Sequence, residues 1–146
     1  MNERERLLEL KRKKERRKSN QNQEKQIRGR LTEFCGEIEF LERKLSNQLS
    51  QYEEGEQKLA VKSYRRDLSN QTEDEIRTES TLQECWSYLA NLISIKIGSG
   101  NWNSLFQFIF DKSKSIRQDI EVQKLCSRNT IKIYEEIGCS LLAKFA

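Results

Sequence analysis

The sequence contains no proline and only six glycines among its 146 residues. Proline and glycine are the strongest signals for turns, and proline is also the residue that most strongly breaks a helix. An all-β fold needs many tight turns, so this composition argues against one. We therefore predict an all-α fold.

The chain also contains no histidine. Without an imidazole it cannot form a Ser-His-Asp or Cys-His catalytic pair or offer a histidine metal ligand. Its cysteines have no C-x-x-C spacing, and the Gly98-Ser99-Gly100 stretch lacks the lysine of a phosphate-binding loop. We expect a protein that is not an enzyme and that has no metal site and no cofactor.

Three of the four cysteines, Cys85, Cys126 and Cys139, lie in apolar-rich helical patterns, which predicts buried and reduced thiols. The N-terminus is charged rather than apolar, so we expect no secretory signal. The longest apolar stretch, residues 89–97, is too short and too polar to span a bilayer. These features predict a protein of the reducing interior of the cell.

Residues 1–26 predict a basic N-terminal helix or tail. Seven of the eight residues at 11–18 are cationic: Lys11, Arg12, Lys13, Lys14, Arg16, Arg17 and Lys18. Such a run suits non-specific contact with nucleic-acid phosphates, a nuclear import signal or an anionic membrane surface, and it is also typical of a solvated tail. No aromatic residue precedes Phe34, so the run has no platform for stacking bases.

Residues 27–70 predict a polar, amphipathic helical segment. Apolar residues recur every three or four positions from Ile27 to Leu45, and a second apolar group at 59–68 indicates a short helix. Thr72 and Glu75 then have the spacing of a capping box, which predicts a helix over about 73–97 that ends at Gly98.

Residues 73–146 are richer in apolar side chains and predict a compact helical unit. From residue 102 to about 123, apolar residues follow one another at three or four positions, even across the Lys-Ser-Lys-Ser stretch at 112–115, so we predict one unbroken helix. Lys114 and Arg117 should face outward, and a last helix should run over about 129–145. The core positions expected on the 102–123 helix are Trp102, Phe106, Ile109 and Ile116.

The stretch Phe-Ile-Phe-Asp-Lys-Ser-Lys-Ser-Ile-Arg-Gln-Asp at 108–119, with Gln123 after it, resembles the signature of the SAC/GANP family. Further elements follow the order of that family: Gly29, Cys35 and Glu39; Val61, Lys62, Tyr64 and Arg66; Glu75, Ile76 and Arg77; Tyr88 and Leu89. The chain departs from the family pattern at several positions: Leu31, Gly36, Thr78, Lys112 and Lys114.

The resemblance implies a non-catalytic helical scaffold. Larger family members organise the nuclear complex that couples transcription to messenger RNA export, and they bind partner subunits and nucleic acid. Smaller members are linked to centrosomes and the spindle, so a cytoplasmic or centrosomal location is the alternative to a nuclear one. Family members continue through more helices to a winged-helix end, which implies a short or truncated member here. The partner contacts that we expect are Lys114, Arg117, Gln118 and Asp119.

Overall fold

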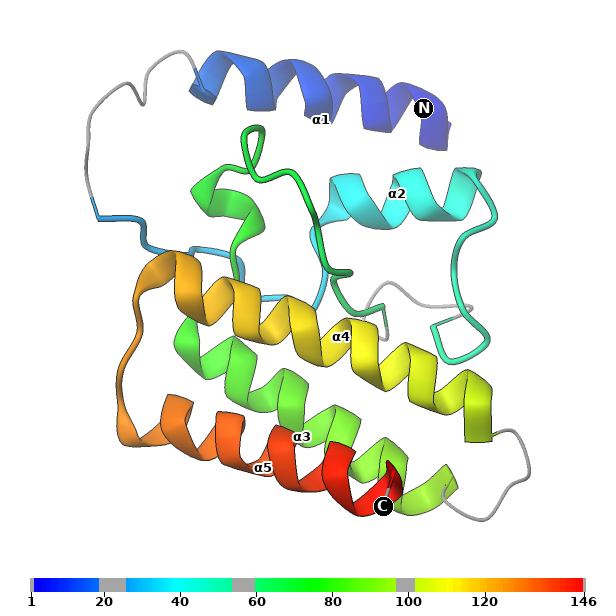
Figure 1. The fold of residues 1–146 in the computed structure, drawn as a ribbon. Helices are drawn as coiled ribbons and strands as arrows, with labels where there is room; N and C mark the ends of the chain where they lie inside the picture. The colour runs from blue at the N-terminus through cyan, green and yellow to red at the C-terminus, as the bar shows by residue number, and fades with distance from the viewer. Residues whose placement is uncertain (1, 19–25, 54–59, 97–101, 146) are drawn as a thin grey trace.

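The computed structural model describes residues 2–18, 26–53, 60–96 and 102–145. Within these residues the chain forms helices and no strands, which confirms the predicted all-α fold class (Figure 1). The elements are α1 (Glu3–Lys18), α2 (Glu37–Leu45), the 3-10 turn η2 (Glu73–Glu75), α3 (Glu79–Lys96), α4 (Trp102–Gln123) and α5 (Arg128–Phe145).

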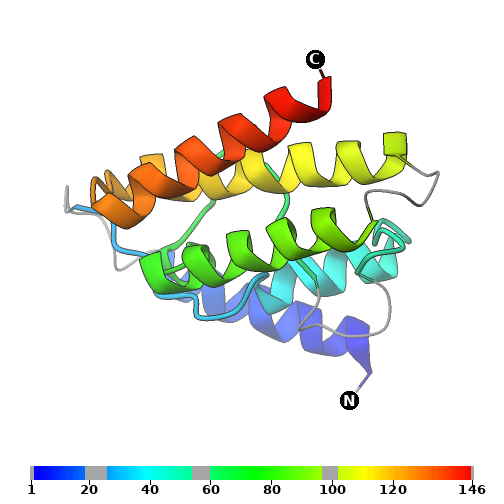
Figure 2. The same ribbon diagram turned by 90° about the horizontal axis from the view of Figure 1, so that it is seen from below.

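The helices form two packed groups. Helices α3, α4 and α5 pack against one another, and α1 packs on α2. Figures 1 and 2 show α1 and α5 on opposite sides of the fold. The main core lies among α3, α4 and α5 and also takes in Val61: Val61, Leu82, Cys85, Trp86, Leu89, Leu105, Phe108, Ile109, Ile116, Ile120, Ile133 and Ile137.

Helix α4 runs without a break from Trp102 to Gln123, as the apolar spacing predicted. Two of its serines, Ser113 and Ser115, are buried, and each donates its hydroxyl proton to a carbonyl group inside the helix. Ser113 Oγ donates to the Phe110 carbonyl at 3.0 Å, and Ser115 Oγ donates to the Lys112 carbonyl at 2.8 Å. These bonds allow small polar residues to lie on the buried face without an unpaired donor.

The middle of the chain is less helical than its apolar spacing predicts. Within residues 27–53 the only α-helix is α2, and residues 60–71 form no helix. Residues 30–31 instead bond to the segment around η2: Arg30 N donates to the Glu73 carbonyl at 3.0 Å, and Leu31 N donates to the Ile76 carbonyl at 2.9 Å. Pairing with residues distant in sequence holds this segment in an extended conformation and overrides its local helical pattern.

The capping box forms, but it starts only η2. Thr72 N donates to Glu75 Oε2 at 3.3 Å, and the chain is extended again at Ile76. Helix α3 begins at Glu79 rather than near 73, with Thr78 Oγ1 accepting from Thr81 N at 3.2 Å. The predicted end at Gly98 lies outside the described residues.

The cysteine prediction is partly wrong. Cys85 is buried, as is Cys35, but Cys126 and Cys139 are exposed, and all four thiols are free. Cys126 lies in the connection between α4 and α5, and Cys139 lies on the solvent side of α5. In the part of the chain that the structure covers, no helix has the length and apolar character needed to span a membrane.

Candidate interaction surface and the buried network beneath it

The signature segment of α4 divides between two environments. Asp119 and Gln118 are buried, whereas Lys114 and Arg117 are half-buried at the surface. Among the expected core positions, Ile109 and Ile116 are buried and Phe106 is half-buried. The side chain of Trp102 lies outside the described part of the structure.

Asp119 is the centre of a buried network. Its Oδ1 accepts a hydrogen bond from Lys62 Nζ at 2.8 Å, and its Oδ2 accepts one from Arg77 Nε at 2.9 Å. Its Oδ2 also accepts from the backbone N of Arg77 at 3.2 Å. All three side chains are at most 2% exposed, so this is a fully buried ion-pair cluster that joins α4 to two distant segments.

The cations of this cluster have further partners. Arg77 Nη2 donates to Ser115 Oγ at 2.9 Å, and Lys62 Nζ donates to Gln71 Oε1 at 2.7 Å. Burial lowers the pKa of the Lys62 ammonium, because the charged form loses its hydration, and the Asp119 carboxylate opposes this shift only in part. The cluster is therefore costly to bury unless every charge keeps its partner.

The end of α4 is hydrogen-bonded to Gly29, the first residue of the Gly29, Cys35 and Glu39 element. Gln123 Oε1 accepts from Gly29 N at 2.8 Å, and Gln123 Nε2 donates to the Arg77 carbonyl at 2.8 Å. A Cβ atom at Gly29 would lie 2.5 Å from the Ile76 carbonyl oxygen. Glycine is needed at this position because two backbone segments approach closely there.

Gln118 binds the backbone of the 60–66 segment. Its Nε2 donates to the Arg65 carbonyl at 2.6 Å, and its Oε1 accepts from Arg65 N at 3.2 Å. These two bonds fix Tyr64 beside α4.

A second buried cluster lies around Glu53 and Lys112. Lys112 Nζ donates to Ser63 Oγ at 2.7 Å and lies 3.7 Å from Glu53 Oε2, while Arg43 donates to Glu53 Oε1. Val61 N donates to Glu53 Oε2 at 2.9 Å. Burial raises the pKa of Glu53, but Lys112, the Arg43 hydrogen bond and the Val61 N–H outweigh burial and leave the pKa below its ordinary value.

The exposed side of α4 carries a cation set between aromatic rings. Lys114 Nζ lies 4.9 Å from the ring centroid of Tyr64 and 5.0 Å from that of Phe110, within the range of cation–π attraction. Both rings are 39% exposed. We call Tyr64, Phe110, Lys114 and Arg117 the α4 outer surface.

Arg117 has a distinct environment on the α4 outer surface. Its Nε is buried and has no hydrogen-bond partner among the described residues. The Tyr134 hydroxyl lies 3.4 Å from the Arg117 carbonyl oxygen, and it donates to Glu121 Oε1 at 3.0 Å. Burial, together with this bond to the Glu121 carboxylate, raises the pKa of Tyr134 to about 12.

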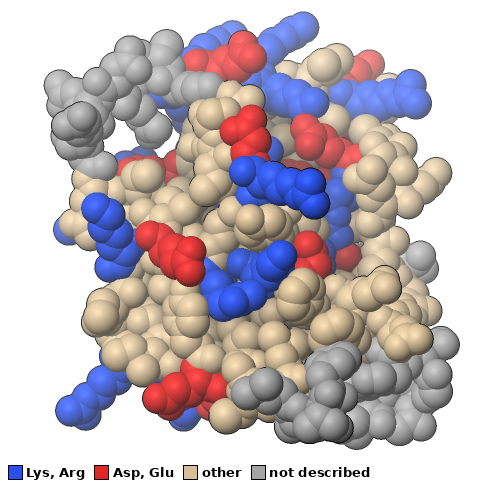
Figure 3. Space-filling model, viewed as in Figure 1, with Lys and Arg blue, Asp and Glu red and all other residues tan. Residues whose placement is uncertain are grey.

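The cationic run of α1 is partly paired with acids of the fold. Lys13 lies near Glu9 of the same helix, and Arg12 and Arg16 are exposed, while the side chain of Lys18 is not described. In Figure 3, cationic and acidic side chains intermingle over the upper part of the molecule, where α1 and α2 lie. Three ion pairs join the cationic run of α1 to α2 and η2: Lys11–Glu42, Lys14–Glu75 and Arg17–Asp74.

Among the described residues, no group of three or more His, Cys, Asp or Glu side chains is placed to hold a metal ion. The charged clusters instead join segments of the chain to one another. The fold and the buried clusters together define a class of protein. It is an all-α domain whose signature residues mainly hold segments of the chain together in the interior.

Comparison with known proteins identifies the family. The model of the SAC3/GANP family matches residues 34–143, and the chain belongs to this family. The chain is 30% identical to Protein xmas of Drosophila melanogaster, in a match that covers 74% of this chain and 6% of the relative. The chain therefore spans only a small part of that relative's length.

Proposed function

We propose that this chain is a non-catalytic helical scaffold or adaptor that acts in the nucleus, in messenger RNA export coupled to transcription. Membership of the SAC3/GANP family supports this proposal. The observation that carries it is the use of the signature residues: Lys62 and Arg77 both pair with Asp119 in the interior, where they join distant segments of the chain. Such an arrangement suits a protein whose task is to hold a shape for partners.

In this proposal the α4 outer surface contacts a protein partner. Lys114 and Arg117 offer positive charge, and the half-exposed rings of Tyr64 and Phe110 offer apolar area beside it. Aromatic residues and arginine are the side chains that most often dominate the binding energy of protein interfaces.

Gln118 and Asp119 contribute to the same contact from inside the fold. Gln118 holds the backbone of Arg65 and thereby positions Tyr64, and Asp119 holds Lys62 two residues earlier in that segment. We propose them as positioning residues for the α4 outer surface.

The test is affinity purification of the tagged, full-length chain from the cells that express it, with the co-purifying proteins identified. Lys114→Glu together with Arg117→Glu should release a partner that the wild-type chain retains, while circular dichroism stays helical. A matched control is Arg128→Glu with Lys132→Glu on the exposed side of α5, which changes the net charge equally and should retain the partner.

Two outcomes would overturn parts of the proposal. Unchanged partner retention by the Lys114/Arg117 variant would remove these residues from the interface. Recovery of centrosome or spindle proteins in place of export factors would replace the export role with that of the smaller family members.

A further inference from the structure

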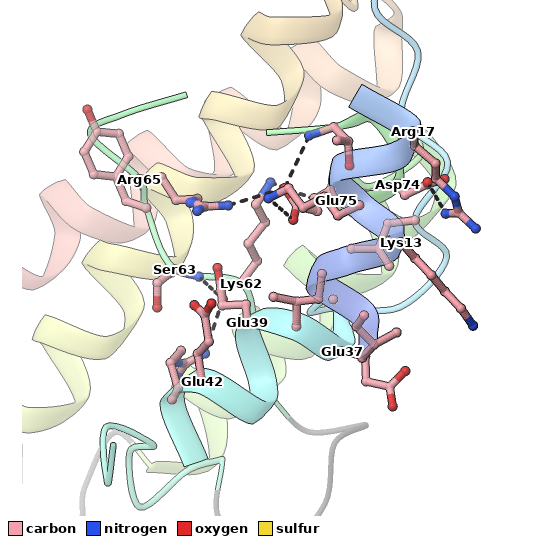
Figure 4. Close-up of a pocket in the computed structure, with 18 of the residues that line it drawn as sticks. Lys13, Arg17, Glu37, Glu39, Glu42, Lys62, Ser63, Arg65, Asp74 and Glu75 are labelled. Carbon is pink, nitrogen blue, oxygen red and sulfur yellow. Dashed lines mark hydrogen bonds and ion pairs between the residues drawn. The ribbon is translucent and has the colours of Figure 1, made fainter. Parts of the chain in front are cut away.

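Helix α1 lies across a surface formed by α2 and η2 (Figures 1 and 4). We call the four acids of this surface, Glu37, Glu42, Asp74 and Glu75, the acidic groove. Each of them pairs with a cation of α1. The pairs are Arg6–Glu37, Lys11–Glu42, Lys14–Glu75 and Arg17–Asp74.

Most of these ion pairs are exposed. In three of them, those made by Arg6, Lys11 and Arg17, both side chains are more than a third exposed to solvent. Exposed ion pairs of this kind contribute little to stability and weaken further as salt is added. Only the pair made by Lys14 is largely shielded, with its two side chains 17% and 13% exposed.

The apolar part of the contact is small. Leu7 and Leu10 pack on a minor cluster that contains Phe40 and Leu41, and both leucines are only half-buried. Leu8 is 56% exposed. Two half-buried leucines, one shielded ion pair and a few exposed ion pairs hold α1 much less firmly than the main core holds α3, α4 and α5.

Helix α1 also leaves space beneath it. A cavity of about 470 Å³ lies between α1, α2 and the 62–75 segment, and Leu10, Lys13 and Lys14 of α1 form part of its wall. Figure 4 shows Arg17 of α1 beside Asp74, and it also shows Lys62 and Arg65 of the 62–75 segment among the acids of α2 and η2. This cavity is partly open to solvent, so α1 lies along the acidic groove without filling it.

We propose that the acidic groove is a docking surface for a basic amphipathic helix of a partner protein, and that α1 occupies it when the partner is absent. Charge complementarity defines the occupant. It carries cations at three-residue spacing, as Lys11, Lys14 and Arg17 do, and two apolar residues like Leu7 and Leu10. Grooves that bind amphipathic helices recognise side chains at this helical spacing. Tyr64 borders both this cavity and the α4 outer surface, but none of the four acids belongs to the α4 outer surface, so the inference does not rest on the proposed function.

The test measures whether the groove binds a helix that is not covalently attached to it. The probe is a fluorescent peptide with the sequence of residues 2–18, and binding is followed by fluorescence anisotropy. Leu7→Ser with Leu10→Ser in the full chain should loosen α1 and free the groove. We expect the loosened chain to bind the peptide about tenfold or more tightly than the wild-type chain, which must first displace α1.

Charge reversal in the groove identifies the binding site. Glu42→Lys with Asp74→Lys, added to the loosened chain, should abolish peptide binding. Glu84→Lys with Glu135→Lys changes the net charge equally at exposed positions of α3 and α5, and this control should still bind. If circular dichroism shows that the serine variant loses helices beyond α1, Lys14→Ala loosens α1 instead, because it removes the shielded ion pair of this helix.

The outcomes decide the proposal. Tighter binding by the loosened chain, lost on groove reversal and kept in the control, supports it. Equal binding by the loosened and wild-type chains would overturn it, and so would equal binding by the groove-reversed and control variants.

Discussion

Replacing Gly29 with alanine perturbs a close approach of two backbone segments, because residue 29 lies against residues 76 and 77. The new Cβ would lie 2.5 Å from the Ile76 carbonyl oxygen and 2.7 Å from that of Arg77. Backbone oxygens cannot rotate out of the way as a flexible side chain can, so the two segments must separate. Gly36→Ala is the matched control, because no atom lies within 4 Å of a Cβ at Gly36.

The size of the effect follows from what the separation breaks. Overpacking of a well-packed site costs about 1–3 kcal/mol. The Gly29 N–Gln123 bond and the Leu31 N–Ile76 bond are stretched at the same time, and a typical hydrogen bond contributes about 1 kcal/mol. We therefore expect Gly29→Ala to lower the free energy of unfolding by about 2–4 kcal/mol, against about 1 kcal/mol or less for Gly36→Ala at the start of α2.

Urea unfolding followed by circular dichroism at a helical wavelength measures both variants under identical conditions. The midpoint of Gly29→Ala should fall well below those of the wild type and of Gly36→Ala. If Gly29→Ala and Gly36→Ala unfold with the same free energy, the close approach of residue 29 to the 76–77 backbone is wrong.

Two further predictions concern thiols and acid. Cys126 and Cys139 should react quickly with a thiol reagent in native buffer, whereas Cys35 and Cys85 should react only after unfolding. Burial excludes the reagent from Cys35 and Cys85 and raises the pKa of both thiols. Equal reaction rates for all four thiols would contradict the burial of these two. The cationic partners of Glu53 outweigh burial and hold its folded-state pKa below the ordinary 4.5. The unfolded chain therefore binds the Glu53 proton more readily than the folded chain does. The stability from this carboxylate is present above pH 4.5 and is lost as the pH falls through the folded-state pKa. Glu53→Gln should therefore flatten the loss of stability in acid, and an unchanged acid profile in urea titrations at a series of pH values would contradict the role of this carboxylate.

The sequence predicts helices well where local pattern and tertiary contacts agree. The 102–123 helix is an example: its apolar spacing persists through the serines, and Ser113 and Ser115 satisfy their own hydroxyls within the helix. The final helix is predicted to within about one residue at its start, because the apolar spacing continues from Ile131 to Leu141.

The extended segments could not be predicted in this way. Ile27 to Phe34 has helical spacing, but the backbone of Leu31 bonds to Ile76 and accepts from Thr78, which are far away in sequence. The same pairing keeps residues 76–78 out of a helix and moves the start of α3 to Glu79. Local periodicity carries no information about such partners.

The buried charges are the other feature that local pattern does not predict. Lys112 reads as one more surface lysine, yet it is 3% exposed, and its partners Ser63 and Glu53 are distant in sequence. The resemblance to the SAC/GANP family provided the only usable signal, because it marked Lys62, Arg77 and Asp119 as motif positions. It did not indicate that these residues contact one another.

The central claim is that Asp119 joins α4 to Lys62 and Arg77 through a fully buried ion-pair cluster. The most direct measurement compares the urea unfolding of Asp119→Asn with that of Asp111→Asn, since Asp111 is 42% exposed and pairs with Lys112 at 3.4 Å. Removing the charge of Asp119 leaves two cations buried without an anion, so the account predicts a loss of about 3–5 kcal/mol, against about 1 kcal/mol or less for Asp111→Asn. Equal losses for the two variants would contradict it.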